Sequence, residues 1–172
     1  MRNYVCLCAL VVLPACLGSG GGDDVDAAVV ADTSMNTSFG SIMNQARLNN
    51  NGSATQLQYN ETVARVAGIH AVDMVENNYL SATIPGTDNG SGQLRDIGDR
   101  LNDAGYRWID LEQLVAQGDF TTQEAYQEFE GSDGCGPATV CTLQEGFSDF
   151  GIAKAGTGSG QKWVFIMTEP QP

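Results

Sequence analysis

The hydrophobic positions in the first half of the chain recur every three or four residues, which is the spacing of helices with one apolar face. The first such segment covers 38–52 and has its apolar side chains at Phe39, Ile42, Met43 and Ala46. The second segment shows the stronger pattern, and its apolar face consists of Val63, Val66, Ala67, His70 and Met74. A side-chain oxygen of Asn60 or Thr62 can cap the start of this second helix, and Asn77 and Asn78 close it.

The patterns in the second half of the chain are shorter. They predict a loop over 84–93, helices over 94–105 and 119–131, a strand over 106–118 and two strands around a Gly-rich turn over 148–170. The apolar run 163–167 does not alternate with polar residues, which is typical of a strand buried on both faces. Because most helices precede the paired strands, we expect an α+β fold with a small antiparallel sheet.

The first sixteen residues have the composition of an export signal. Arg2 precedes an apolar run over 4–13, which is too short to cross a bilayer because a spanning helix needs about 20 apolar residues. The run leads into the sequence Leu-Pro-Ala-Cys, which ends at Cys16 and resembles a bacterial lipobox. In a lipobox the cysteine is lipidated and becomes the first mature residue. An ordinary signal peptide cleaved nearby is the alternative.

Composition divides the chain into three parts. Residues 16–36 are rich in Gly and Asp and show no helical period, which predicts a flexible tether. The predicted organisation is therefore a signal peptide over 1–15, the tether over 16–36 and one domain over 37–170. Leu17 follows the cysteine of the lipobox, as in outer-membrane lipoproteins of Gram-negative bacteria. We therefore expect an exported protein, anchored in the outer membrane and facing the periplasm.

The chain is strongly acidic, with a formal net charge of −13 that becomes −14 when Arg2 leaves with the signal peptide. Such a surface repels the phosphate backbone of nucleic acids, so a nucleic-acid partner is not expected. It also repels anionic lipid head groups, and an acyl chain on Cys16 would therefore have to hold the protein at a membrane.

The five cysteines fit an exported protein. Cys6 and Cys8 leave with the signal peptide and Cys16 would carry the lipid, so only Cys135 and Cys141 remain. This pair could form a disulfide, bind a metal ion or provide a nucleophilic thiol. In an oxidising compartment a disulfide is the simplest outcome, and so short a loop would contribute about 2 kcal/mol of stability. A zinc site needs about four ligands, and this chain has 1 His.

The order of these pieces resembles the CAP domain, the cysteine-rich secretory, antigen 5, pathogenesis-related-1 superfamily, also called the SCP-like domain, in its bacterial form. The matching stretches include "FGSIMNQARLNNNGSATQLQYNETVARVAGIHAVDM", "GDRLNDAGYRW", "LEQLVAQG", "EAYQEFEGSDG" and "DFGIAKAG". They follow the family order and cover nearly all of 39–169. The resemblance implies a three-layer α-β-α sandwich with a central antiparallel sheet.

The resemblance also implies a cavity that usually holds two His and acidic partners and can bind a divalent metal. In this chain Ala82 stands at the first His position and Cys135 at the second. Glu112 and Ser132 keep their family positions. With both His positions changed, a bound metal would lack its imidazole ligands, so we expect no metal, no cofactor and no catalytic residue.

Two residues have more than one interpretation. His70 could line the cavity, but a hydrogen-bonded core His on an apolar helix face is the favoured interpretation. Glu112 is flanked by apolar residues of a predicted strand. It could face the cavity as a carboxyl group with a perturbed pKa, or it could face solvent.

Two functions remain for the chain. The first is a non-catalytic binding module of the cell envelope, which would bind a small apolar ligand, a cell-wall glycan or a protein. The second is a divergent metal-dependent hydrolase or peptidase, which would need Glu112 as a general base. The missing His residues favour the binding module.

Overall fold

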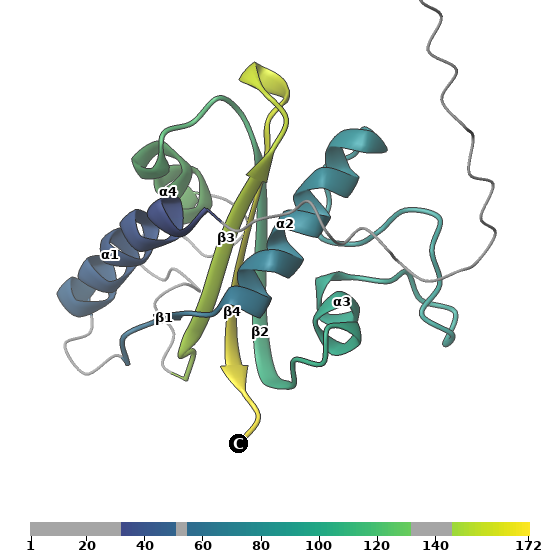
Figure 1. Cartoon of the computed structure of the whole chain (residues 1–172), viewed down its shortest axis with the longest axis horizontal. Helices are drawn as coiled ribbons and strands as arrows, with labels where there is room; N and C mark the ends of the chain where they lie inside the picture. The colour runs from purple at the N-terminus through teal and green to yellow at the C-terminus, as the bar shows by residue number, and fades with distance from the viewer. Residues whose placement is uncertain (1–31, 51–54, 132–145) are drawn as a thin grey trace, which may run out of the picture.

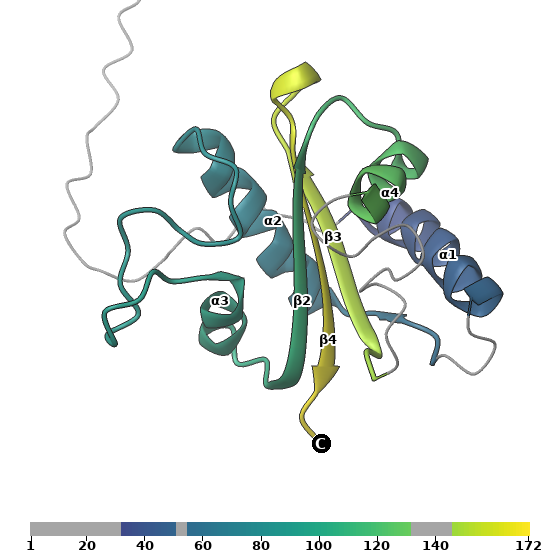
Figure 2. The same ribbon diagram turned by 180° about the vertical axis from the view of Figure 1, so that it is seen from behind.

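The computed structural model of the chain describes residues 32–50, 55–131 and 146–172. Its elements are α1 (Thr33–Asn50), β1 (Gln58–Tyr59), α2 (Glu61–Glu76), α3 (Ile97–Asp103), β2 (Trp108–Gln117), α4 (Thr122–Gly131), β3 (Asp149–Ala155), the short 3₁₀ helix η2 (Gly158–Gly160) and β4 (Lys162–Pro170). Helices α1 and α4 cover one face of the sheet, and α2 and α3 cover the other face (Figures 1 and 2). This is the predicted three-layer α+β arrangement. No helix within the described ranges is long and apolar enough to cross a membrane.

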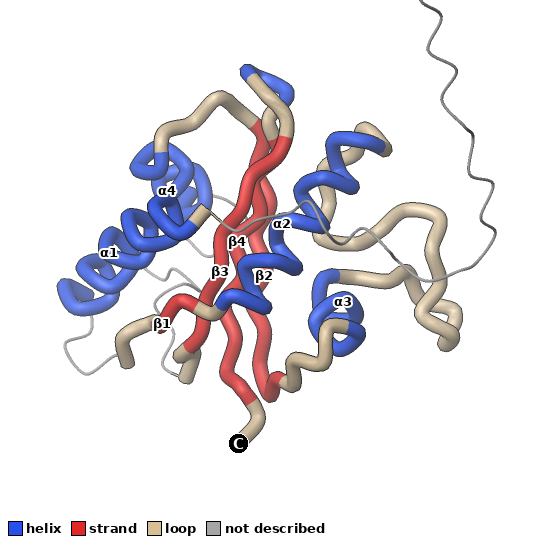
Figure 3. Tube along the Cα trace, in the orientation of Figure 1, coloured by secondary structure: helices blue, strands red, loops and turns tan. Residues whose placement is uncertain are grey.

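The sheet has the strand order β1-β3-β4-β2 (Figure 3). Strand β4 pairs in antiparallel fashion with both β2 and β3, as the sequence predicts. Its central position explains the unbroken apolar run, because the side chains on both of its faces are covered and the residues 162–168 are all buried. The two-residue strand β1 pairs in parallel with β3 and was not predicted, since two residues carry no recognisable period.

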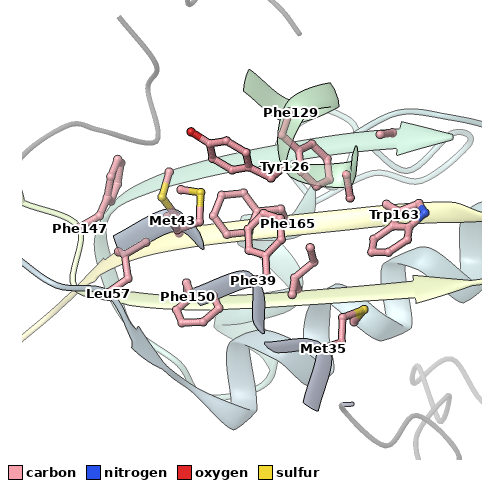
Figure 4. Packing of buried hydrophobic residues seen from close by; sticks show 14 residues of the cluster. Met35, Phe39, Met43, Leu57, Tyr126, Phe129, Phe147, Phe150, Trp163 and Phe165 are labelled. Carbon is pink, nitrogen blue, oxygen red and sulfur yellow. The ribbon is translucent and has the colours of Figure 1, made fainter. Parts of the chain in front are cut away.

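Alternate side chains of β4 supply two separate cores. Trp163, Phe165 and Met167 face α1 and α4, where they join an aromatic cluster (Figure 4). Val164 and Ile166 face α2 and α3, where they join a smaller cluster of mainly aliphatic side chains. The sheet therefore separates two layers that differ in chemistry as well as in position.

Two asparagine side chains attach α1 to β3 and to the segment just before β1. The amide of Asn36 donates to the carbonyl of Ile152 and accepts from its N–H, both over 2.9 Å. Asn44 makes the same pair of bonds with Leu57, over 3.0 Å and 2.8 Å. Each amide thus pairs with a backbone N–H and C=O in the way that a neighbouring strand would.

The first helix begins before the predicted boundary between the tether and the domain. Helix α1 starts at Thr33, and Met35 and Asn36 are buried. Asp32 caps this start by accepting a hydrogen bond of 3.0 Å from the N–H of Met35. Residues 33–36, which the sequence assigns to the tether, therefore belong to α1. The sequence pattern missed these residues because they show no apolar period.

The capping prediction for α2 is confirmed, and the structure adds a capping box at the start of α4. Asn60 is the N-cap of α2, and its side chain accepts from the N–H groups of Thr62 and Val63. At the start of α4, the hydroxyl of Thr121 accepts from the N–H of Glu124, while the Glu124 carboxylate accepts from the N–H of Thr121.

Candidate functional site

The sequence points to six residues of interest, and the structure describes two of them. His70 lies in α2 and Glu112 lies in β2. Ala82, at a family His position, lies in the segment between α2 and α3. The other four candidates lie outside the described residues, and they are Cys16, Ser132, Cys135 and Cys141. The predicted lipidation and the predicted disulfide therefore remain predictions.

His70 is a buried residue of α2 with an exposed fraction of 0%. Its Nε2 lies 2.7 Å from the carbonyl oxygen of Ser81, and its ring meets that of Tyr79 edge to face at 6.0 Å. Because a carbonyl can only accept, Nε2 carries the proton, and the buried Nδ1 has no hydrogen-bond partner among the described residues. Burial lowers the pKa of His70, so the ring is neutral at neutral pH. This environment is that of a core His.

A polar network beside His70 connects α2 to α3. The Asp73 carboxylate accepts a hydrogen bond of 2.7 Å from the hydroxyl of Tyr79 and forms an ion pair with Arg100 of α3. Burial and the hydrogen bond to Asp73 raise the pKa of Tyr79, so its hydroxyl stays protonated and donates. The sequence pattern does not reveal this network, although Asp73 lies three residues after His70, the spacing of neighbours on a helix surface.

A second missed network lies near the start of β3 and joins β3 and β4 to the cap of α2 and to the segment before β2. The hydroxyl of Tyr106 lies 2.9 Å from the Asp149 carboxylate and 2.6 Å from the hydroxyl of Thr168. The side chain of Asn60 donates to the same Asp149 oxygen over 2.7 Å. Burial, together with the nearby Asp149, raises the pKa of Tyr106 to about 12. These side chains satisfy one another's hydrogen-bonding groups, which indicates a structural role for the network.

Glu112 lies in the outer strand β2, opposite Met167 of β4. Its side chain is partly buried, and burial raises the pKa of its carboxyl group. The backbone N–H of Gln113 lowers the pKa of this carboxyl group, and the nearby charge of Asp110 raises it. The sequence allows Glu112 to face either a cavity or solvent. The structure shows a partly buried carboxylate on the same face of the sheet as Met167.

His70 and Glu112 lie on opposite faces of the sheet. Met167 belongs to the core under α1 and α4, so Glu112 faces that layer, whereas His70 belongs to α2 in the other layer. The two side chains cannot form an acid–base pair or share a metal ion. Within the described part of the chain, no group of three or more His, Cys, Asp or Glu could hold a metal ion.

Comparison with solved structures identifies the fold. An extracellular SCP-domain protein from Bacillus anthracis matches 79% of this chain with a TM-score of 0.61 and 20% identity, and the match spans 40% of its own length. An outer surface protein from Borrelia burgdorferi matches 78% of this chain with a TM-score of 0.63 and 14% identity, over 92% of its length. A cysteine-rich secretory protein from Staphylococcus aureus matches 79% with a TM-score of 0.54 and 12% identity, over 39% of its length.

The sequence comparisons give no further assignment. No protein-family model matches the sequence, and no curated protein matches it. The likeness to the solved structures therefore concerns the arrangement of helices and strands, which is that of the CAP, or SCP-like, domain.

Proposed function

We propose that this chain, whose described part has the CAP fold, is an exported and membrane-tethered binding module that catalyses no reaction. The observation that carries the proposal is the separation of His70 and Glu112 by the sheet. A general base needs its partner groups within hydrogen-bond reach, and a hydrolytic zinc needs about three protein ligands. A carboxylate on one face and a buried neutral imidazole on the other meet neither requirement.

The ligand proposed for the module is a small apolar molecule, a cell-wall glycan or another protein. The net charge of −13 makes nucleic acid an unfavourable partner. Two of the structural neighbours carry names that place them outside the cell or on its outer surface, which supports export of this chain as well. Lipidation at Cys16 would hold the domain at the envelope, because the acidic chain has little electrostatic attraction to anionic lipid.

Anchoring is expected to depend on Cys16. The variant Cys16→Ser should move from the membrane fraction to the soluble fraction or fail to mature, because serine cannot take the thioether-linked lipid. Detergent partitioning and fractionation of cells that express the full chain would measure this, with Cys8→Ser as the matched control in the same leader. Equal membrane retention of wild type and Cys16→Ser would contradict the proposed anchor.

One observation favours the alternative function, a metal-dependent hydrolase. Burial raises the pKa of Glu112, as a carboxylate general base near neutral pH would require. Elemental analysis after dialysis separates the two functions. We expect well below one zinc per chain, both in wild type and in Glu112→Gln. About one zinc per wild-type chain that is lost in Glu112→Gln would support the hydrolase and overturn the binding module.

A further inference from the structure

The chain turns back along α2 after that helix ends (Figure 1). Helix α2 ends at Glu76, and Asn78 then adopts a left-handed backbone conformation with a φ of 51°. Residues 79–82, which we call the return segment, follow this turn. The N–H of Tyr79 donates to the carbonyl of Met74 over 3.1 Å, which joins the start of the return segment to the helix.

His70 makes the next contacts between α2 and the return segment. Its Nε2 donates to the carbonyl of Ser81 over 2.7 Å, and its ring meets that of Tyr79 edge to face. The imidazole is fully buried, whereas no residue of the return segment is fully buried and Leu80 has an exposed fraction of 47%. A segment with so little buried surface can separate from the fold locally, without global unfolding.

The second ring nitrogen makes this contact sensitive to protons. Nδ1 of His70 is buried and has no hydrogen-bond partner among the described residues. In the neutral ring Nδ1 is an acceptor, because Nε2 carries the proton that is donated to Ser81. A proton added to Nδ1 would place a positive charge and a second N–H donor in a buried site where the described residues provide no acceptor for it.

Charged groups from α2 and α3 act on the imidazole in both directions. Asp73 of α2 and Asp96, the N-cap of α3, favour a charged ring, and Arg100 of α3 opposes it. The Asp73 carboxylate is already bound by Arg100 and by the hydroxyl of Tyr79. Strands β3 and β4 contribute aliphatic side chains to this layer, namely Ala153, Val164 and Ile166. Burial has the largest effect of all, so the pKa of His70 lies below its ordinary value.

From these contacts we infer that His70 is a proton-sensitive latch, which holds the return segment against α2 while the imidazole is neutral and releases it when Nδ1 takes up a proton. In the open state the imidazolium reaches water, which hydrates its charge. The closed state disfavours the charged ring, so its full stability is present above the ordinary imidazole pKa of about 6.5 and is lost progressively as the pH falls below that value. This inference goes beyond the proposed binding function and does not depend on it.

Release of the return segment changes the surface of the α2 and α3 layer while the rest of the fold stays closed. Tyr79 and Ala82 pack against the aliphatic cluster of this layer, and both leave it when the segment opens. The chain beyond the segment remains attached, because Thr83 forms a β-bridge with Asp96 and Ile84 is buried. Opening therefore uncovers apolar surface beside α2 at mildly acidic pH.

The single histidine of the chain makes a direct test possible. The chain has 1 His, so the imidazole resonance in an NMR titration belongs to His70 if the protein is purified without a histidine tag. The full chain carrying Cys16→Ser, which removes any effect of a lipid, is titrated from about pH 8 to about pH 5. The ring should stay neutral until the pH is below about 6.5, and the amide resonances of residues 79–82 should shift with the same midpoint. A ring that titrates at or above its ordinary pKa, or unchanged amide resonances, would contradict the latch.

The variant His70→Gln is the matched control. Its side-chain amide can donate to the carbonyl of Ser81 as Nε2 does, but it does not titrate. Hydrogen exchange at the N–H of Tyr79, corrected for the intrinsic effect of pH, should lose about tenfold in protection between about pH 7.5 and about pH 5.5 in the Cys16→Ser parent. The same loss should be less than about twofold when His70→Gln is added. Asp73 and Asp96 are present in both proteins, so the difference isolates His70.

The N–H of Ile166 in the central strand β4 distinguishes local opening from global unfolding. Its protection should be the same at both pH values. The inference is overturned if Tyr79 keeps its protection at the lower pH, if His70→Gln loses protection to the same extent, or if Ile166 loses protection in parallel with Tyr79. If His70→Gln does not fold, the titration of the parent protein decides alone.

Discussion

Replacing Gly151 with alanine is expected to lower the free energy of unfolding by about 3 kcal/mol or more. Gly151 lies in β3 where the start of α2 crosses it. A Cβ at this position would lie 2.2 Å from the backbone nitrogen and 2.4 Å from the Cα of Ala64. These are backbone atoms of a helix, so no side-chain rotation can relieve the contact. The whole of α2 would have to move away from the sheet.

Urea unfolding of Gly151→Ala and of Gly160→Ala would measure this effect. A Cβ at Gly160 meets nothing within 4 Å, so this control should change the free energy of unfolding by no more than about 0.5 kcal/mol. If Gly151→Ala does not accumulate as folded protein whereas Gly160→Ala does, the result agrees with the prediction. Equal unfolding midpoints for the two variants would show that α2 does not lie this close to β3.

Replacing Asn36 with alanine is expected to cost about 2–4 kcal/mol, the second-largest effect. Asn36 is fully buried, and its amide satisfies both the N–H and the C=O of Ile152. Alanine leaves both backbone groups buried without these partners, and each such loss costs about 1–3 kcal/mol. The better helix propensity of alanine offsets only about 0.5 kcal/mol of this.

Thr37→Ala is the matched control for Asn36→Ala. It changes the next residue of the same helix, whose exposed hydroxyl bonds only to the carbonyl of Thr33. Its free energy of unfolding should change by less than about 0.5 kcal/mol. The difference between the two variants isolates the contact across the layers. An Asn36→Ala variant as stable as Thr37→Ala would show that water replaces the amide at Ile152.

The sequence predicts the helices and the main strands well, because their patterns are local. Asn60 can be recognised as a cap since the groups that it serves are only two and three residues away. The apolar run of β4 likewise indicates a central strand. These features depend on propensity and period, which a single sequence displays.

The sequence offers no comparable indication of the contacts that α1 makes with β3 and with the segment before β1. Asn36 and Asn44 are ordinary polar residues in the helical pattern, yet both lie on its inner side. Asn36 bonds to Ile152, 116 residues away, and Asn44 bonds to Leu57, 13 residues away. No periodic pattern encodes which backbone group will need an amide, because that need arises only after the sheet has formed.

The positions of the candidate site residues relative to the helices are equally hard to predict from the sequence. Alternation along β2 places Glu112 and Leu111 on opposite faces, but alternation alone does not say which helices cover each face. The structure sets Glu112 in the layer of α1 and α4, and it sets His70 in the layer of α2 and α3. The core interpretation of His70 agrees with its zero exposure and its bond to Ser81.

The central place of β4 has a consequence for the moment at which this chain can fold. β4 lies between β2 and β3 in the sheet although it follows both of them in sequence. Until it arrives, neither strand has its neighbour, and both cores lack their central side chains. A chain that crosses a membrane with its N-terminus first would therefore remain unfolded until β4 has emerged. The last strand of the sheet in the sequence thus controls when both layers can pack.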